Sequence, residues 1–109
     1  MTPRRLERLP RTELDEGAVI YEARSFASRV LGLAFLREIP RGEALFIADC
    51  RSVHTFGMRF AIDVAFLDEA GRALRVERAV PPRRVLREPE AFAAIESRAG
   101  EISRFVRAP

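Results

Sequence analysis

A single carboxylate interrupts a nearly continuous apolar run, and this combination constrains the fold more than any other feature of the chain. The run extends from Phe60 to Leu67, and Asp63 lies inside it. Successive side chains of a β-strand point to opposite faces, so a strand here would be apolar on both faces apart from Asp63. We therefore expect a strand that is buried on both sides. A buried carboxylate needs a charged or hydrogen-bonding partner.

The partner of Asp63 can be structural or functional. The nearest candidates in the sequence are Arg51, His54, Thr55 and Arg59. In the structural interpretation, Asp63 forms an ion pair or a carboxylate-to-backbone network that fixes the loop before the strand. In the functional interpretation, it is an orienting or binding acid in a pocket. We favour the structural interpretation, because structural networks also place acids in this way.

Short strand-like segments dominate the rest of the chain. They are Ala18–Tyr21, Ala44–Ala48 and Leu74–Val80, with a hairpin turn at Asp68–Gly71, a brief extended piece at Val85–Leu86 and an ambiguous segment at Ala91–Ile95. Ser25 is expected to cap a short helix that ends before Gly32, and residues 102–106 form a helical turn or short strand. The fold class that this predicts is mostly β, a β-sandwich or partly open barrel with one or two short helices in a single compact domain. Residues 1–16 are expected to be a polar, extended or frayed lead-in, and residues 17–109 a single β-rich domain.

The composition excludes several classes of site. The chain has one cysteine and one histidine, so a disulfide framework, a multi-cysteine zinc site and a multi-histidine metal centre are ruled out within one chain. We expect no metal and no cofactor. All 19 basic residues are arginine, but the net charge is only +3. We do not expect nucleic-acid binding, because there is no basic stripe with interleaved aromatic residues. Weak accessory binding would use Arg78, Arg83, Arg84 and Arg87, and would weaken steeply with salt.

No apolar run approaches the length of about 18 residues that a membrane-spanning helix needs. The arginines near the N-terminus are not followed by the apolar core of a signal peptide. A cytoplasmic location with a reduced Cys50 is the simplest interpretation.

Three motifs together point to a known family. The central block contains Phe56-Gly57-Met58-Arg59, then Ile62-Asp63-x-x-Phe66-Leu67-Asp68 and a turn at Gly71. Gly32-Leu33-Ala34 precedes it, and Glu96-x-x-Ala99-Gly100 follows it. The chain resembles the domain of unknown function 192 family from about Tyr21 to Phe105, with Ala34 and Ala61 standing where that family usually has Met and Pro. The resemblance implies a small, sandwich-like β-rich domain and no established reaction, cofactor or catalytic residue.

These observations lead to a binding hypothesis and to an alternative. We expect a non-enzymatic binding or interaction module for a small polar or anionic ligand or a protein partner, with its site in a cleft beside the Ala44–Ala48 and Ile62–Leu67 strands. The candidate ligand-binding residues are Arg51, His54, Thr55, Arg59 and Asp63. The alternative is a small hydrolase or transferase that uses Cys50 or Asp63 with His54. Loss of turnover in both Cys50→Ala and His54→Ala variants would support the enzyme.

Overall fold

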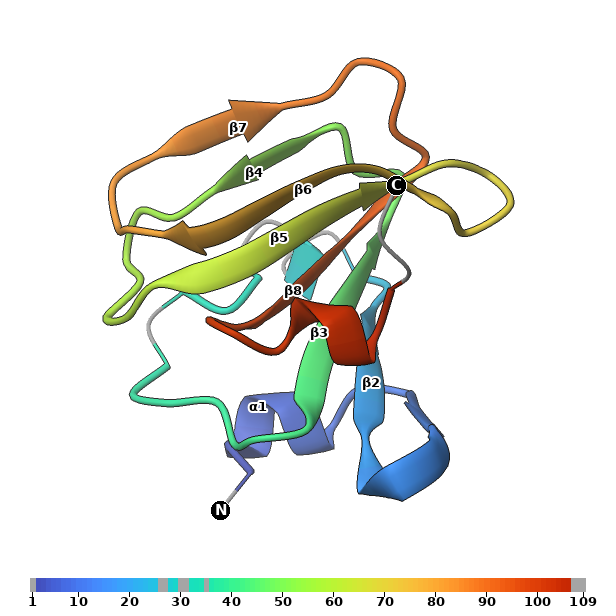
Figure 1. The fold of residues 1–109 in the computed structure, drawn as a ribbon. Coiled ribbons are helices and arrows are strands. Elements are labelled where there is room, and N and C mark those ends of the chain that lie inside the picture. The colour runs from blue at the N-terminus through green and yellow to red at the C-terminus, as the bar shows by residue number, and fades with distance from the viewer. Residues whose placement is uncertain (1, 26–27, 30–31, 35, 107–109) are drawn as a thin grey trace.

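The described residues of this computed structural model, 2–25, 28–29, 32–34 and 36–106, contain eight strands in two sheets. The main sheet has the order β1-β2-β3-β8-β5-β6, and β4 and β7 form a second, two-stranded sheet (Figure 1). The bounds of the strands are β1 Arg11–Glu13, β2 Val19–Ala23, β3 Glu43–Ala48, β4 Ser52–His54, β5 Ile62–Leu67, β6 Ala73–Val80, β7 Val85–Arg87 and β8 Ala93–Arg98. The prediction of a mostly β domain is confirmed.

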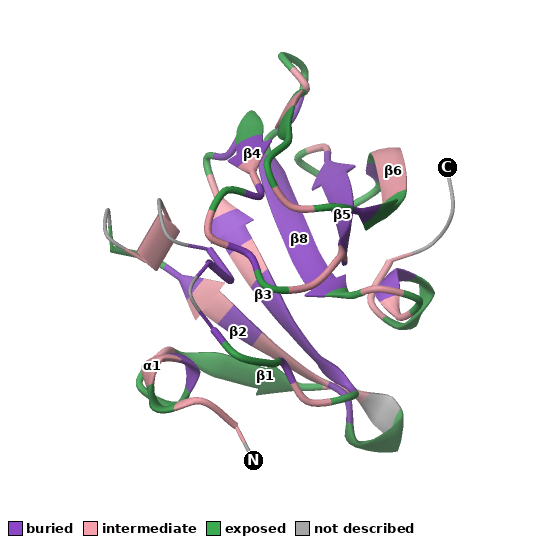
Figure 2. Ribbon diagram, turned by 90° about the vertical axis from the view of Figure 1, so that its left-hand side faces the viewer, coloured by how far each residue is buried: buried purple, intermediate pink, exposed green. Residues whose placement is uncertain are grey.

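Strands β5 and β8 form the centre of the main sheet. All six residues of β5 are buried, and so are the first five of β8 (Figure 2). They pair in antiparallel register with Val64 opposite Glu96 and Asp63 opposite Ser97. The other pairs described in this sheet are antiparallel too, except for β2 and β3, which run parallel. A parallel pair requires a crossover connection, and residues 24–42 supply it.

The two faces of the main sheet bury separate hydrophobic clusters. Ile62, Val64 and Phe66 belong to the larger cluster, whereas Ala65 and Leu67 belong to the smaller one on the other face. The alternation predicted from the apolar run is therefore confirmed. Because directly opposite residues on paired strands share a face, Glu96 lies on the Val64 face and Asp63 on the other.

Short helices whose bounds the described residues define lie outside the strands: α1 (Arg4–Glu7), and single 3₁₀ turns at Asp15–Gly17 and Ile102–Arg104. Residues 1–16 were expected to be extended or frayed, but α1 buries Leu6 and β1 pairs with β2. The driving force for this order is burial of one leucine side chain together with main-chain hydrogen bonding, neither of which the polar composition reveals.

Several local predictions are settled by the structure. Ala91–Ile95 was ambiguous, and β8 covers most of it. Ser52–His54 form β4, which pairs with β7. At Ser25, the Oγ accepts a hydrogen bond from the backbone N–H of Ser28 (3.0 Å), as an N-cap does. Ser28 and Arg29 are helical. The remainder of the predicted helix, residues 26–27 and 30–31, lies outside the described residues.

Candidate functional site

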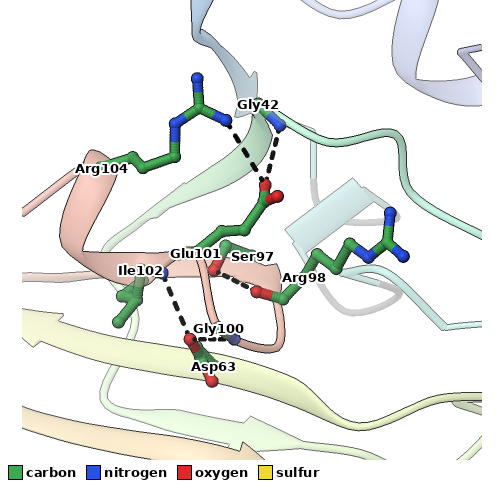
Figure 3. Close-up of polar contacts among 8 residues, drawn as sticks. All are labelled: Gly42, Asp63, Ser97, Arg98, Gly100, Glu101, Ile102 and Arg104. Carbon is green, nitrogen blue, oxygen red and sulfur yellow. Dashed lines mark hydrogen bonds and ion pairs between the residues drawn. The ribbon is translucent and has the colours of Figure 1, made fainter.

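Asp63 is sealed inside the protein and binds backbone amides (Figure 3). Its Oδ1 accepts a hydrogen bond from the N–H of Ala79 (2.8 Å). Its Oδ2 accepts hydrogen bonds from the N–H groups of Gly100 (2.8 Å) and Ile102 (3.2 Å). This network ties β5 to the bulged end of β6 and to the turn that follows β8. The carboxylate is satisfied by main-chain donors, so the carboxylate-to-backbone network of the structural interpretation is present, but it fixes β6 and the turn after β8 instead of the loop before β5.

A cavity of about 360 Å³ lies at the end of β3, beside β4. It is lined by Arg29, Ile47, Asp49, Cys50, Arg51, Ser52 and His54. A chamber of about 20 Å³ adjoins it, since Arg29, Ile47, Ser52 and His54 line both spaces. Gly32, Val53 and Glu96 complete the lining of the chamber. The crossover between β2 and β3 thus supplies one wall, and the β3–β4 segment supplies another.

Arg29 reaches this cavity from the crossover. One of its terminal nitrogens, Nη2, donates a hydrogen bond to the carbonyl oxygen of Asp49 (3.0 Å), which follows β3 in a left-handed conformation (φ +49°). Its Nε is buried and has no hydrogen-bond partner among the described residues. A buried guanidinium N–H without a partner is costly, and such groups usually have a hydrogen-bond partner. The described residues therefore leave this donor of a cavity-lining side chain unsatisfied.

Glu96 lies at the inner end of the site and is completely buried. Its Oε1 accepts a hydrogen bond from the N–H of Leu33 (3.1 Å). Burial raises the pKa of Glu96 to about 7, although the Leu33 N–H and the Arg5 guanidinium oppose this shift. Both protonation states are therefore accessible near neutral pH, and the carboxyl can either donate or accept a hydrogen bond.

A glycine makes the approach to Glu96 possible. Gly32 has a left-handed backbone (φ +54°), and a Cβ at this position would lie 2.6 Å from Glu96 Oε1. The carbonyl oxygen of Gly32 accepts a hydrogen bond from Arg5 Nη2 (2.7 Å). The close packing of the crossover against β8 therefore requires the absence of a side chain at position 32.

Cys50 and His54 line the same cavity, but Asp63 does not. The thiol of Cys50 donates a hydrogen bond to the carbonyl oxygen of Ser52 (3.2 Å), and burial raises its pKa. A thiol with a raised pKa is a poor nucleophile at neutral pH. His54 is half-buried, with its ring 6.4 Å from that of Phe56 between centroids.

The cavity brings together two of the five residues predicted to bind a ligand, Arg51 and His54. Thr55 is fully buried nearby and braces the loops: its Oγ1 donates a hydrogen bond to the carbonyl oxygen of Pro81 (2.7 Å) and accepts one from the N–H of Arg84 (2.8 Å). Arg59 is exposed and does not line the cavity. Asp63 is on the face of the sheet opposite Glu96.

The sequence interpretation missed Arg29 and Glu96 as site residues. Glu96 carried a usable signal, because it is an acidic residue that directly follows the small apolar residues Ala93–Ile95. The same argument that singled out Asp63 applies to it. Arg29 carried no comparable signal, since one arginine on a short helix is an ordinary surface residue.

The described part of the chain contains no group of three His, Cys, Asp or Glu residues that could hold a metal ion. No helix in the described ranges is long and apolar enough to cross a membrane.

Comparison with known proteins identifies the family and the fold. The family model described as "Uncharacterized ACR", domain of unknown function 192, matches residues 12–106. No curated protein matches the chain. A crystal structure from Sinorhizobium meliloti 1021, named a "putative transcription regulator", is similar with a TM-score of 0.73 at 17% identity, over 91% of this chain and 85% of that one. A protein of unknown function from Novosphingobium aromaticivorans DSM 12444 has a TM-score of 0.69 at 16% identity, over 95% of this chain and 91% of that one.

The matched region covers most of the chain, so this protein belongs to the domain of unknown function 192 family. At these identities the two solved structures show a shared fold and carry no assignment of function.

Proposed function

We propose that this member of the domain of unknown function 192 family is a binding module for a small molecule that carries an anionic group. The ligand occupies the cavity at the end of β3, with its anionic group facing Arg29 and Arg51. The observation that carries the proposal is the buried Nε of Arg29, which has no hydrogen-bond partner among the described residues and belongs to a side chain in the cavity wall.

The charges around the cavity support an anionic ligand. Arg29 and Arg51 are permanently positive, whereas Asp49 is the negative residue of the rim. Guanidinium groups bind carboxylates and phosphates by strong, charge-assisted hydrogen bonds. The volume, about 360 Å³, is within the range of small-molecule sites. Ile47 adds an apolar wall for the carbon skeleton of the ligand.

The chemistry of Cys50 favours binding over catalysis. An acyl-transfer mechanism needs a thiolate, a base and an orienting group in contact. Here burial raises the pKa of Cys50, and the Asp63 carboxylate is occupied by main-chain N–H groups on the other face of the sheet. We assign the module to the cytoplasm, where Cys50 stays reduced.

Calorimetric titration with small carboxylates, phosphate and sulfate at pH 7 and low salt tests the proposal. We expect at least one of these anions to bind, and Arg51→Ala to weaken its binding at least tenfold, because a charge-assisted hydrogen bond is worth about 1.5–3 kcal/mol. Arg51 is exposed, so this variant keeps the fold. Arg29→Met removes the buried donor and should reduce affinity at least as much.

Arg41→Ala is the matched control, because Arg41 is exposed and precedes β3, at the end opposite to the cavity. Its affinity should equal that of the unmodified protein. The proposal is wrong if no anion binds more tightly than about 10 mM, or if Arg51→Ala and Arg41→Ala bind equally well.

A further inference from the structure

The chamber that adjoins the cavity is small, and polar residues form part of its lining. Its volume of about 20 Å³ holds one water-sized group and excludes a carboxylate or a phosphate. The polar residues Glu96, Ser52 and His54 are among those that line it. A ligand that fills the outer cavity can therefore place one small polar group in the chamber, and nothing larger.

The protonation state of Glu96 determines which polar group of a ligand can form a hydrogen bond with it in the chamber. With a pKa of about 7, the carboxyl alternates at neutral pH between a hydrogen-bond acceptor and a donor. An ammonium group can only donate, and a carbonyl oxygen can only accept. A hydroxyl does both, so it is satisfied in either state of Glu96.

The charged groups around Glu96 leave its pKa at about 7, so its carboxyl can still act as a donor or as an acceptor. Facing it from the packed elements are Arg5 of α1, Tyr21 of β2, Glu43 of β3, Arg29 of the crossover, Cys50, and His54 of β4. Arg5 donates its own hydrogen bond to the carbonyl oxygen of Gly32. Tyr21 and Glu43 are joined to each other by a short hydrogen bond (2.5 Å). Burial of the Glu96 carboxyl outweighs the attraction of Arg5.

We infer that the ligand is a small hydroxy acid, whose carboxylate binds Arg29 and Arg51 in the outer cavity and whose hydroxyl enters the chamber beside Glu96. This inference rests on the proposed function and narrows its ligand class. The hydroxy-acid inference differs from the proposal of a general anion site. An anion without a hydroxyl places no group in the chamber beside Glu96.

A matched ligand series tests the inference. Butyrate and α-, β- and γ-hydroxybutyrate share one carboxylate and one carbon skeleton, and differ in the presence and position of the hydroxyl. We expect at least one hydroxybutyrate to bind about tenfold more tightly than butyrate, the effect of one well-placed hydrogen bond. Glu96→Leu should abolish this advantage, whereas Glu69→Leu, at an exposed turn residue, should retain it.

A second measurement needs no variant. In protein labelled at its glutamate carboxyl carbons, the tighter hydroxybutyrate should shift the NMR signal of Glu96, and butyrate should leave it unchanged. Equal affinities for butyrate and all three hydroxybutyrates, with binding still weakened by Arg51→Ala, would overturn the hydroxy-acid inference and leave the anion proposal standing. If none of the four compounds, phosphate or sulfate binds, both proposals fail.

Discussion

The Oδ1 of Asp63 accepts a hydrogen bond from the backbone N–H of Ala79, a residue held in the left-handed conformation (φ +50°). The pairing of β5 with β6 is irregular at this place, between Ile62 and Val64. The carboxylate therefore satisfies a donor that the irregular strand pairing leaves without its regular partner. The other oxygen, Oδ2, fixes the turn after β8 through Gly100 and Ile102.

Asp63→Asn should lower the free energy of unfolding by about 3 kcal/mol. Asparagine keeps one acceptor oxygen and turns an NH₂ group towards main-chain donors, which leaves buried N–H groups without partners. Urea unfolding followed by circular dichroism measures the loss. Asp68→Asn is the control. Both N–H groups that bind Asp68 donate to the same oxygen, Oδ1, so the remaining amide oxygen of asparagine can accept both hydrogen bonds. Equal stabilities of the two variants would contradict the buried network.

Gly32→Ala should be more damaging than Gly71→Ala. Both glycines have a positive φ, so both substitutions impose backbone strain of about 1 kcal/mol. At Gly71 a Cβ meets nothing within 4 Å, but at Gly32 it would lie 2.6 Å from the buried carboxyl of Glu96. We expect an extra loss of about 2 kcal/mol in thermal or urea unfolding. Similar losses for both variants would show that the crossover is not packed against Glu96.

The raised pKa of Glu96 makes stability depend on pH in a defined window. The folded protein retains this proton up to about pH 7, whereas the unfolded chain loses it near 4.5. The unfolded state therefore binds fewer protons within that window, and stability falls as pH rises. The total loss attributable to Glu96 is about 3 kcal/mol, after which the curve levels off.

Urea unfolding of the unmodified protein and of Glu96→Gln, across this pH range, isolates that contribution. Glutamine does not titrate, and the remaining groups cancel in the difference between the two curves. We expect the advantage of the unmodified protein to shrink with rising pH up to about 7. Parallel curves would mean that Glu96 is already ionised in the folded protein at pH 4.5.

Cys50 should react slowly with alkylating reagents. Its thiol is buried against the Ser52 carbonyl oxygen, and burial raises its pKa. At about pH 8 we expect iodoacetamide to modify Cys50 at least tenfold more slowly than it modifies free cysteine. Mass spectrometry measures the rate. A rate equal to that of free cysteine would support the hydrolase or transferase alternative, in which Cys50 is a nucleophile.

The sequence predicts features that depend on neighbouring residues, such as strands and burial. It does not predict contacts between segments that are far apart along the chain. The nearly continuous apolar run predicts β5 and the burial of Asp63 correctly. The partners of Asp63 lie 16, 37 and 39 residues away and are main-chain N–H groups, which have no sequence signature. The partners predicted for Asp63 were therefore residues close to it in the sequence, such as Arg59 and His54.

The cavity illustrates the same limit. Arg51 and His54 were predicted as site residues because they lie near Asp63 in the sequence, and both line the cavity. Arg29 and Glu96 come from the crossover and from β8, and only the parallel pairing of β2 with β3 brings the crossover over this face. Periodicity identifies strands but does not specify the order in which they pair.

The parallel pairing of β2 and β3 separates the residues that fix the strand register from the crossover residues, of which Arg29 lines the cavity. The pair has a fixed register from Val19 opposite Glu43 to Ala23 opposite Ile47. Residues 24–42 begin and end at this register. Leu33, Ala34, Leu36 and Ile39 within this stretch are buried in the main core, but residues of the stretch outside the core can be replaced without altering the strand ladder. Arg29 lies within that stretch. Ligand preference can therefore diverge among relatives through the crossover while the sheet that supports it remains the same.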